Sequence, residues 1–156
     1  MNIGKGWWIG LFAVLGLSGQ AQAGANLLAV RSEQAFPEAM LTLQTSIRAH
    51  GYTVARVQRV DVGLAGAGFT TDKYRIVFYG KAEEVKRLSR KYPDLIPYLP
   101  LSFSIFAEGG QTIIVAMNPA YLENAYPQPQ LQIQFARWQS DVESIMADLR
   151  AASAEE

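Results

Sequence analysis

The chain has 156 residues, with 14 Lys and Arg against 14 Asp and Glu, one His and no Cys. Because the formal net charge is zero, we expect no binding to nucleic acid and no attraction to an anionic membrane. The absence of cysteine excludes disulfides, thiolate metal sites, iron–sulfur clusters and covalent haem attachment.

The first 23 residues have the pattern of a cleavable secretory signal. Lys5 supplies a positive charge, residues 7–17 are a short apolar segment, and small residues flank position 22. The apolar segment has about ten residues, roughly half of what spans a bilayer, so we expect no stable membrane anchor. A buried N-terminal helix is the alternative interpretation. We predict cleavage near Ala23 and a periplasmic or secreted location.

The residues that follow suffice for one domain with a hydrophobic core and are too few for two. We place this domain at residues 24–150 and expect the small, polar residues 151–156 to form a flexible tail. Its first element is a strand, predicted from the short apolar run at residues 27–32.

A helix is predicted next, because apolar residues recur at spacings of three and four between Phe36 and His50. Pro37 suits a first helical turn, and Gly51 suits the position just past a helix end. Residues 52–62 alternate imperfectly and are rich in β-branched types, which favours a second strand.

The glycines at positions 63, 66 and 68 do not form a phosphate-binding motif. Such a loop opens directly into a helix or ends in Gly-Lys-Ser/Thr, whereas residues 69–73 lead into another strand. We interpret residues 63–68 as a connector of small residues. The third strand is predicted at residues 74–79.

The second half of the chain begins with an amphipathic helix at residues 81–92, whose last turn is cationic. Prolines then mark a corner, and a hairpin with strands at residues 101–108 and 111–118 turns at two glycines. Pro119 ends the hairpin, and a proline-spaced loop follows at residues 124–129. The last helix carries an apolar stripe made of Phe135, Trp138, Val142, Ile145, Met146 and Leu149.

The predicted order is therefore β-α-β-β-α-β-β-α. Pairs of strands separated by helices favour an α+β two-layer sandwich, with a mostly antiparallel sheet of about five strands and helices on one face.

Several pieces of the chain form a recognisable set. They are His50-Gly51-Tyr52, Ile76-Val77-Phe78-Tyr79-Gly80, Leu99-Pro100-Leu101, Phe106-Ala107-Glu108-Gly109-Gly110, and Met117-Asn118-Pro119 with Leu122 nearby. In this order, between residues 27 and 122, they resemble the family called domain of unknown function 302 (DUF302). The resemblance implies a small α+β domain that is dimeric or multimeric, and it implies no reaction.

The chain departs from that family where relatives carry reactive side chains. Gly80 and Leu101 stand where many relatives have cysteine, and Val62 follows Asp61 where others have an Asp-His pair. Thiol or histidine chemistry of those relatives therefore does not transfer to this chain.

His50 is the single histidine and the first candidate for a base, a ligand or a pH switch. Its place on the apolar stripe beside Gly51 favours a helix-capping or near-core role, because a catalytic histidine needs an orienting partner. With Met117 it has the ligand types of a non-covalent haem site, which the sequence leaves open. We expect no other cofactor and no metal.

Acidic residues stand at strand ends and corners, namely Asp61, Asp72, Asp94 and Glu108. Two carboxylates that met in an enclosed cleft, with Tyr hydroxyls nearby, would support an alternative function as a small periplasmic hydrolase or isomerase. The sequence has no Gly-x-Ser-x-Gly elbow and no metal-ligand cluster, so we favour a protein without catalysis.

Alternation places Phe103 and Ile105 on one face of the sheet, and Ser104 and Phe106 on the other. If helices cover one face only, the second apolar set needs a partner. We therefore predict an exported binding or accessory module, a homo-oligomer (a dimer) that buries one sheet face or a pocket near Tyr98. Its partner is a small apolar ligand or a periplasmic protein. The candidate ligand-binding residues are Tyr98, Leu101, Phe103, Phe106 and His50.

Overall fold

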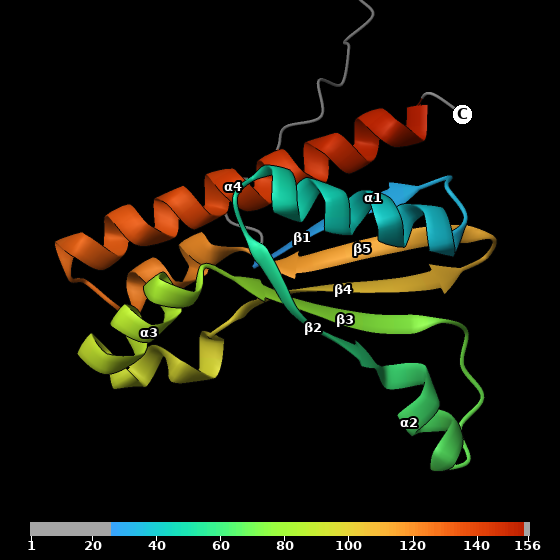
Figure 1. Ribbon diagram of the computed structural model, residues 1–156, viewed down its shortest axis with the longest axis horizontal. Helices are drawn as coiled ribbons and strands as arrows, with labels where there is room; N and C mark the ends of the chain where they lie inside the picture. Colours follow the sequence, from blue (N-terminus) through green and yellow to red (C-terminus); the bar gives the residue numbers. More distant parts are fainter. Residues whose placement is uncertain (1–25, 155–156) are drawn as a thin grey trace, which may run out of the picture.

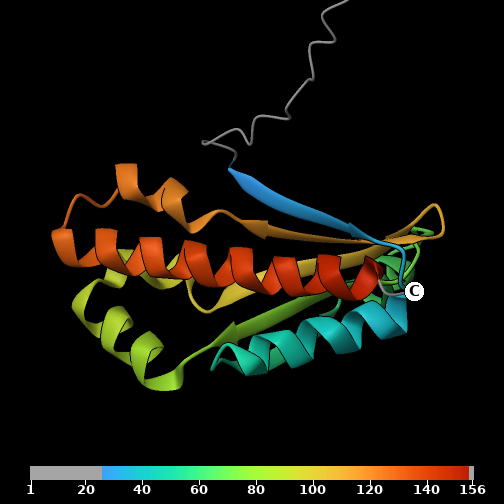
Figure 2. The same ribbon diagram turned by 90° about the horizontal axis from the view of Figure 1, so that it is seen from above.

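The computed structural model describes residues 26–154, which form an antiparallel sheet with two long helices on one of its faces (Figures 1 and 2). The secretory signal expected at residues 1–23 lies outside the described residues. Within residues 26–154, no helix combines the length and the hydropathy needed to cross a membrane.

All five strands belong to one sheet with the order β1-β5-β4-β3-β2, and every neighbouring pair is antiparallel. The strands are β1 (Leu27–Ser32), β2 (Thr53–Arg59), β3 (Tyr74–Gly80), β4 (Leu101–Glu108) and β5 (Gln111–Met117). The register of β2 against β3 shifts between Val54 and Arg56, which makes a β-bulge in an edge strand. The predicted α+β class and the antiparallel sheet are confirmed.

Two helices, α1 (Phe36–Ala49) and α4 (Pro129–Ala154), cover one face of the sheet (Figure 2). Pro37 lies in the first turn of α1, and Gly51, with φ 78°, follows its end, as the sequence predicted. Every member of the predicted α4 stripe is buried.

The end of the chain differs from our expectation. We predicted a flexible tail at residues 151–156, but α4 continues to Ala154, and residues 155–156 lie outside the described residues. The hydroxyl of Ser153 accepts a hydrogen bond from the backbone N–H of Glu33 at 2.7 Å, which holds the last turn of α4 against the segment between β1 and α1.

The core lies between the helices and the covered face of the sheet. Val77 pairs with Phe103 on this face and Ile105 pairs with Ile114, and all four side chains are fully buried. Each large apolar side chain buried in this way contributes roughly 1.5–3 kcal/mol to folding, so this layer supplies the main stabilisation.

The region after β2 is a second correction. We predicted a strand to Val62 and an irregular connector from residue 63, but β2 ends at Arg59 and α2 (Val60–Gly66) follows. Arg59 pairs with Arg75, one residue from the start of β3, so a longer β2 would have no strand beside it. The backbone forms helical hydrogen bonds there instead. Figure 1 shows α2 projecting from the sheet on the side away from α1 and α4.

Short 3-10 helices form the predicted corner and the segment that precedes the predicted loop at residues 124–129. After α3 (Ala82–Lys91), the corner is η1 (Pro93–Tyr98), and the peptide bond Leu99-Pro100 is cis before β4 begins. After β5, η2 (Pro119–Asn124) leads to α4. These segments gather at one end of the sheet (Figure 1).

Candidate functional site

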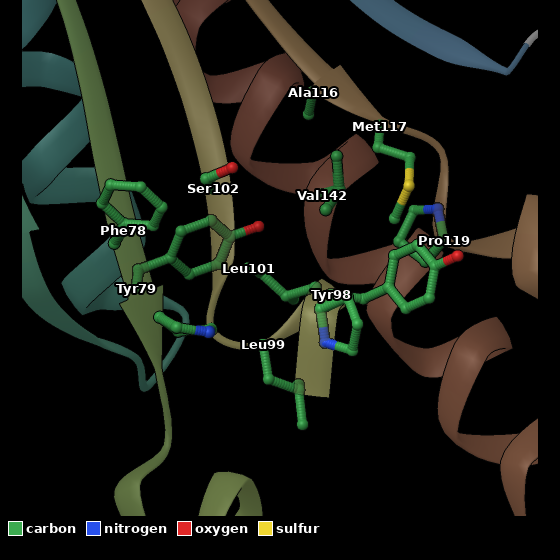
Figure 3. Close-up of a pocket in the computed structure, with 12 residues that line it drawn as sticks. Phe78, Tyr79, Tyr98, Leu99, Leu101, Ser102, Ala116, Met117, Pro119 and Val142 are labelled. Carbon is green, nitrogen blue, oxygen red and sulfur yellow. The ribbon is translucent and has the colours of Figure 1, made fainter. Parts of the chain in front are cut away.

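A pocket of about 200 Å³ lies at this end of the sheet, where the chain passes from η1 into β4 (Figure 3). Its walls come from β3, the corner, β4, β5, η2 and α4, and no lining side chain carries a charge. Most of its lining residues are of apolar type, although polar and apolar atoms share the exposed wall about equally; the apolar set includes Tyr98, Leu99, Leu101, Met117, Pro119 and Val142. The pocket therefore suits an uncharged occupant that combines apolar surface with a hydrogen-bonding group.

Gly80 allows α3 to pack closely against the end of β3. A Cβ atom added at Gly80 would lie 3.0 Å from Cγ2 of Val85 and 3.6 Å from Cβ of Pro100. The absence of a side chain at position 80 thus lets Val85 of α3 approach the end of β3. Pro100, which lines the pocket, lies beside the same glycine at an ordinary van der Waals distance.

Tyr79 supplies the one buried hydroxyl of the pocket lining that has no hydrogen-bond partner among residues 26–154. The residue is 1 % exposed, and its ring stacks on Phe103 with centroids 5.1 Å apart. The edge of Tyr52 closes the other side at 5.3 Å. Burial raises the pKa of the Tyr79 phenol, so the group stays protonated and is a hydrogen-bond donor at neutral pH.

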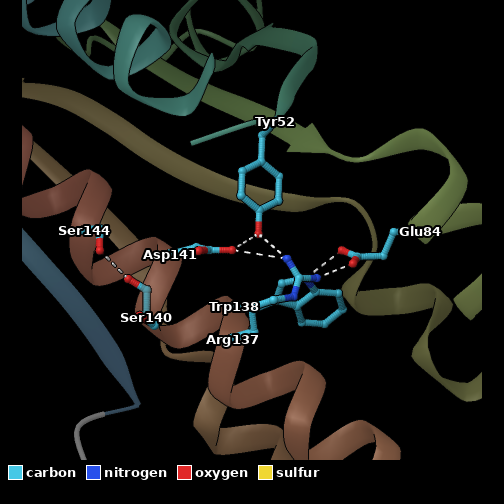
Figure 4. A network of polar contacts seen from close by, with 7 residues as sticks. All are labelled: Tyr52, Glu84, Arg137, Trp138, Ser140, Asp141 and Ser144. Carbon is cyan, nitrogen blue, oxygen red and sulfur yellow. Dashed lines mark hydrogen bonds and ion pairs between the residues drawn. The ribbon is translucent and has the colours of Figure 1, made fainter. Parts of the chain in front are cut away.

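Beside Tyr79, a network of charged and polar side chains joins α4 to α3 and to the start of β2 (Figure 4). The Tyr52 hydroxyl donates to Asp141 Oδ2 at 2.5 Å, and Arg137 pairs with Asp141 at 3.3 Å and with Glu84. The indole N–H of Trp138 donates to Glu84 at 3.0 Å. Burial, and next the hydrogen bond to Asp141, raise the pKa of Tyr52. Arg137 pairs with both carboxylates, so the network joins α4 to α3 and to the start of β2; its single positive charge against two carboxylates leaves the group with a net charge of −1.

The structure brings together two of the five predicted site residues. Tyr98 and Leu101 line the pocket. Phe103 lies behind it, stacked on Tyr79, and Phe106 lies on the uncovered face of the sheet against Tyr74, with ring centroids 5.9 Å apart. His50 lies elsewhere, at the end of α1.

His50 acts as the C-terminal cap residue of α1 and contacts α4. Its Nε2 lies 3.0 Å from Asp148 Oδ2, and the Ser46 hydroxyl donates to the same oxygen at 2.5 Å. The hydrogen bond from Ser46, and then His50, hold the pKa of Asp148 below its usual value. Met117 lines the pocket at the end of β5, and β4 and β3 separate that strand from β2. The structure thus does not bring His50 and Met117 together as a ligand pair.

The acidic residues considered for catalysis are dispersed. Asp61 pairs with Arg75, whose hydrogen bond lowers the pKa of Asp61. Glu108 pairs with Arg31 at 3.5 Å on the surface, and Asp72 and Asp94 are exposed. Within the described part of the chain, no three His, Asp or Glu residues group as a metal site. An enclosed acid–base pair is therefore not formed by these carboxylates.

No helix of residues 26–154 packs along the second face of the sheet, and we call the central residues of this face the open face. Strand register places them in rows, with Tyr74 beside Phe106 and Ile113, and Ile76 beside Ser104 and Val115. Phe78, Ser102 and Met117 form the next row, at the pocket end. We predicted that Phe103 and Ile105 lie on one face of the sheet and Ser104 and Phe106 on the other. This prediction is confirmed, because Phe103 and Ile105 are buried whereas Ser104 and Phe106 are half-buried.

Sequence reasoning missed Tyr79 and the network around Arg137. Alternation in β3 places Tyr79 on the same face as the buried Val77, and a phenol on a core face is a usable signal for an internal polar site. The network gave no such signal, because Tyr52, Glu84 and Arg137 come from three elements far apart in sequence.

Comparison with known proteins agrees with this description. The family model "Domain of unknown function DUF302" matches residues 28–153. No curated protein is similar enough to match. The crystal structure of an uncharacterized conserved DUF302 protein from Bacillus stearothermophilus has 18% sequence identity and a TM-score of 0.72, over 81% of this chain and 99% of that chain. The fold is thus shared at low sequence identity, and the chain belongs to the DUF302 family.

Proposed function

We propose that this protein is an exported binding module without catalytic activity, which forms a homodimer through the open face and keeps the pocket for a ligand. The observation that carries the proposal is the apolar surface on β3, β4 and β5 that no helix of residues 26–154 covers, formed by the half-buried side chains of Tyr74, Ile76, Phe78, Phe106, Val115 and Met117. Apolar surface of this kind is a sign of an interaction site. The export part of the proposal rests on the signal-like pattern of residues 1–23.

The distribution of charge on this surface favours a protein partner. The rows across β3, β4 and β5 are apolar or small and neutral, whereas charged residues stand around them. Arg56 lies on the β2 side, and Arg31 with Glu108 lies toward β1. An apolar centre with a polar rim is the usual arrangement of a protein interface. Because this centre carries no charge, two identical copies meet without like-charge repulsion.

The size of the surface indicates how a second copy fits. Strands of about seven residues, spaced about 4.8 Å apart, give a five-stranded face of roughly 550 Å². A stable interface buries about 800 Å² on each partner. The projecting α2 supplies the difference, because Val62 is 50 % exposed and Phe69, just beyond α2, is 64 % exposed. In a two-fold dimer, the α2 of each copy packs beside the sheet of the other.

The proposal is tested by the molar mass of the secreted protein in solution, measured by light scattering after gel filtration. We expect a dimer for the native protein and a monomer for Ile76→Lys, which places a charge at the centre of the open face. Ile133→Lys is the matched control, because Ile133 is 73 % exposed on α4. It should remain dimeric. A native monomer, or a dimer unaffected by Ile76→Lys, would show that the open face is not the interface.

A further inference from the structure

We propose that the pocket binds a small, neutral molecule with an apolar ring and a hydrogen-bond acceptor, such as a cyclic ketone, and that the Tyr79 hydroxyl donates to that acceptor. This inference rests on the binding-module function and specifies its ligand. The ligand assignment can be tested independently of the dimer, because Tyr79 lies with Val77 and Phe103 on the covered face of the sheet and not on the open face.

The first argument is the state of the Tyr79 hydroxyl. It is buried without a hydrogen-bond partner among the described residues, and it belongs to a side chain that lines the pocket. A buried hydroxyl is unfavourable until it finds an acceptor. Figure 3 shows the phenol of Tyr79 reaching in among the lining residues. A ligand atom in the pocket is therefore the acceptor that the protein itself does not provide.

The second argument is the charge of the lining. No Lys, Arg, His, Asp or Glu side chain lines the pocket, so an ionic ligand would lose its hydration without gaining a partner. Because burial raises the pKa of Tyr79, the phenol donates and does not accept as a phenolate. The ligand group that faces it is then a neutral acceptor, such as the oxygen of a ketone, aldehyde, ester or ether.

The third argument is size. The pocket of about 200 Å³ is somewhat larger than an apolar cavity of about 150 Å³ that accepts benzene. It therefore has room for one six-membered ring with a small substituent. Cyclohexanone is a suitable probe, and methylenecyclohexane is its matched control, because it replaces the carbonyl oxygen with a CH₂ group of similar shape.

The experiment is an NMR titration of the native protein with each probe. We expect cyclohexanone to shift the amide signals of residues lining the pocket, and the affinity for cyclohexanone to fall about tenfold in Tyr79→Phe. The affinity for methylenecyclohexane should be unchanged or higher in that variant. Tyr121→Phe, which removes a hydroxyl from an exposed side chain that neither lines the pocket nor belongs to the open face, should leave both affinities unchanged.

A second measurement needs no variant. The buried Tyr79 hydroxyl proton should move downfield when cyclohexanone binds and stay in place with methylenecyclohexane. Equal cyclohexanone affinity in the native protein and Tyr79→Phe, or no shift at the pocket with millimolar cyclohexanone, would overturn the ligand assignment. Because the Ile76→Lys test reports only on molar mass, a failed dimer leaves this test standing.

Discussion

Tyr52 and Tyr79, whose rings are in edge-to-face contact, differ in the hydrogen bonding of their hydroxyl groups. The hydroxyl of Tyr52 donates to Asp141, whereas the hydroxyl of Tyr79 has no partner within the described part of the chain. Burial raises the pKa of both phenols, so neither ionises at neutral pH. The two side chains are chemically identical but only one hydroxyl has a hydrogen-bond partner. They are therefore a matched pair for measuring how much a hydrogen bond from a buried hydroxyl contributes to the free energy of unfolding.

We predict that the same substitution has different effects at these two positions. Tyr52→Phe should lower the free energy of unfolding by about 1–2 kcal/mol, because Asp141 loses a charge-assisted hydrogen bond. Tyr79→Phe should leave that free energy unchanged or raise it by up to about 1 kcal/mol, because it removes a buried group without a partner. Urea unfolding of both variants measures the difference. Strong destabilisation by Tyr79→Phe would mean that its hydroxyl already has an acceptor.

At the scale of elements, α4 holds the other helices in place through polar contacts at two points. Arg137 and Trp138 bind Glu84 of α3, and Asp148 binds Ser46 and His50 at the end of α1. The apolar stripe of α4 fixes the helix on the sheet, and these contacts fix its rotation and the positions of its neighbours. Since α3 precedes the corner, the first contact also supports the pocket wall.

The contact between α1 and α4 should depend on pH. The pKa of Asp148 is lowered from its ordinary value of 3.8 by Ser46 and then by His50. A carboxyl group with a lowered pKa stabilises the fold above its unfolded pKa, and this stabilisation is lost as the pH falls through the folded pKa. We therefore expect Asp148→Asn to be less stable than the native protein at pH 6, and the difference to shrink as the pH falls below 3.8 and through the lowered folded pKa. Thermal unfolding across this range measures the difference, and a gap that is constant with pH would contradict it.

The elements that sequence predicted well are those whose pattern is set by burial. The hairpin of β4 and β5 and the stripe of α4 follow from alternation and from spacings of three and four. The helix α2 was missed because β-branched residues at positions 60 and 62 favour a strand locally. In the antiparallel pair, the end of β2 lies beside the start of β3 at Tyr74, so a longer β2 would have no neighbouring strand. Tyr98 and Leu101 were found through the proline corner. Tyr79 was not, since hydrogen-bond satisfaction depends on three-dimensional contacts.

At the scale of the whole molecule, the pocket and the open face adjoin. Phe78 and Met117 belong to the last row of the open face and also line the pocket. A second copy packed on the open face therefore lies next to any bound ligand. If both proposals hold, ligand and dimer affect each other's affinity by the same factor, because linkage is reciprocal.

The bulge in β2 decides what kind of assembly this sheet permits. An edge strand with regular backbone groups can pair with another sheet and continue without limit, as in fibres. In β2 the shifted register between Val54 and Arg56 and the exposed side chains of Arg56 and Arg59 oppose such pairing. The bulge therefore opposes pairing at one of the two edges of the sheet, the other edge being β1. Of the two faces, one is covered by helices, and a contact between two identical copies of the open face is satisfied by two copies, so association through that face stops at a dimer.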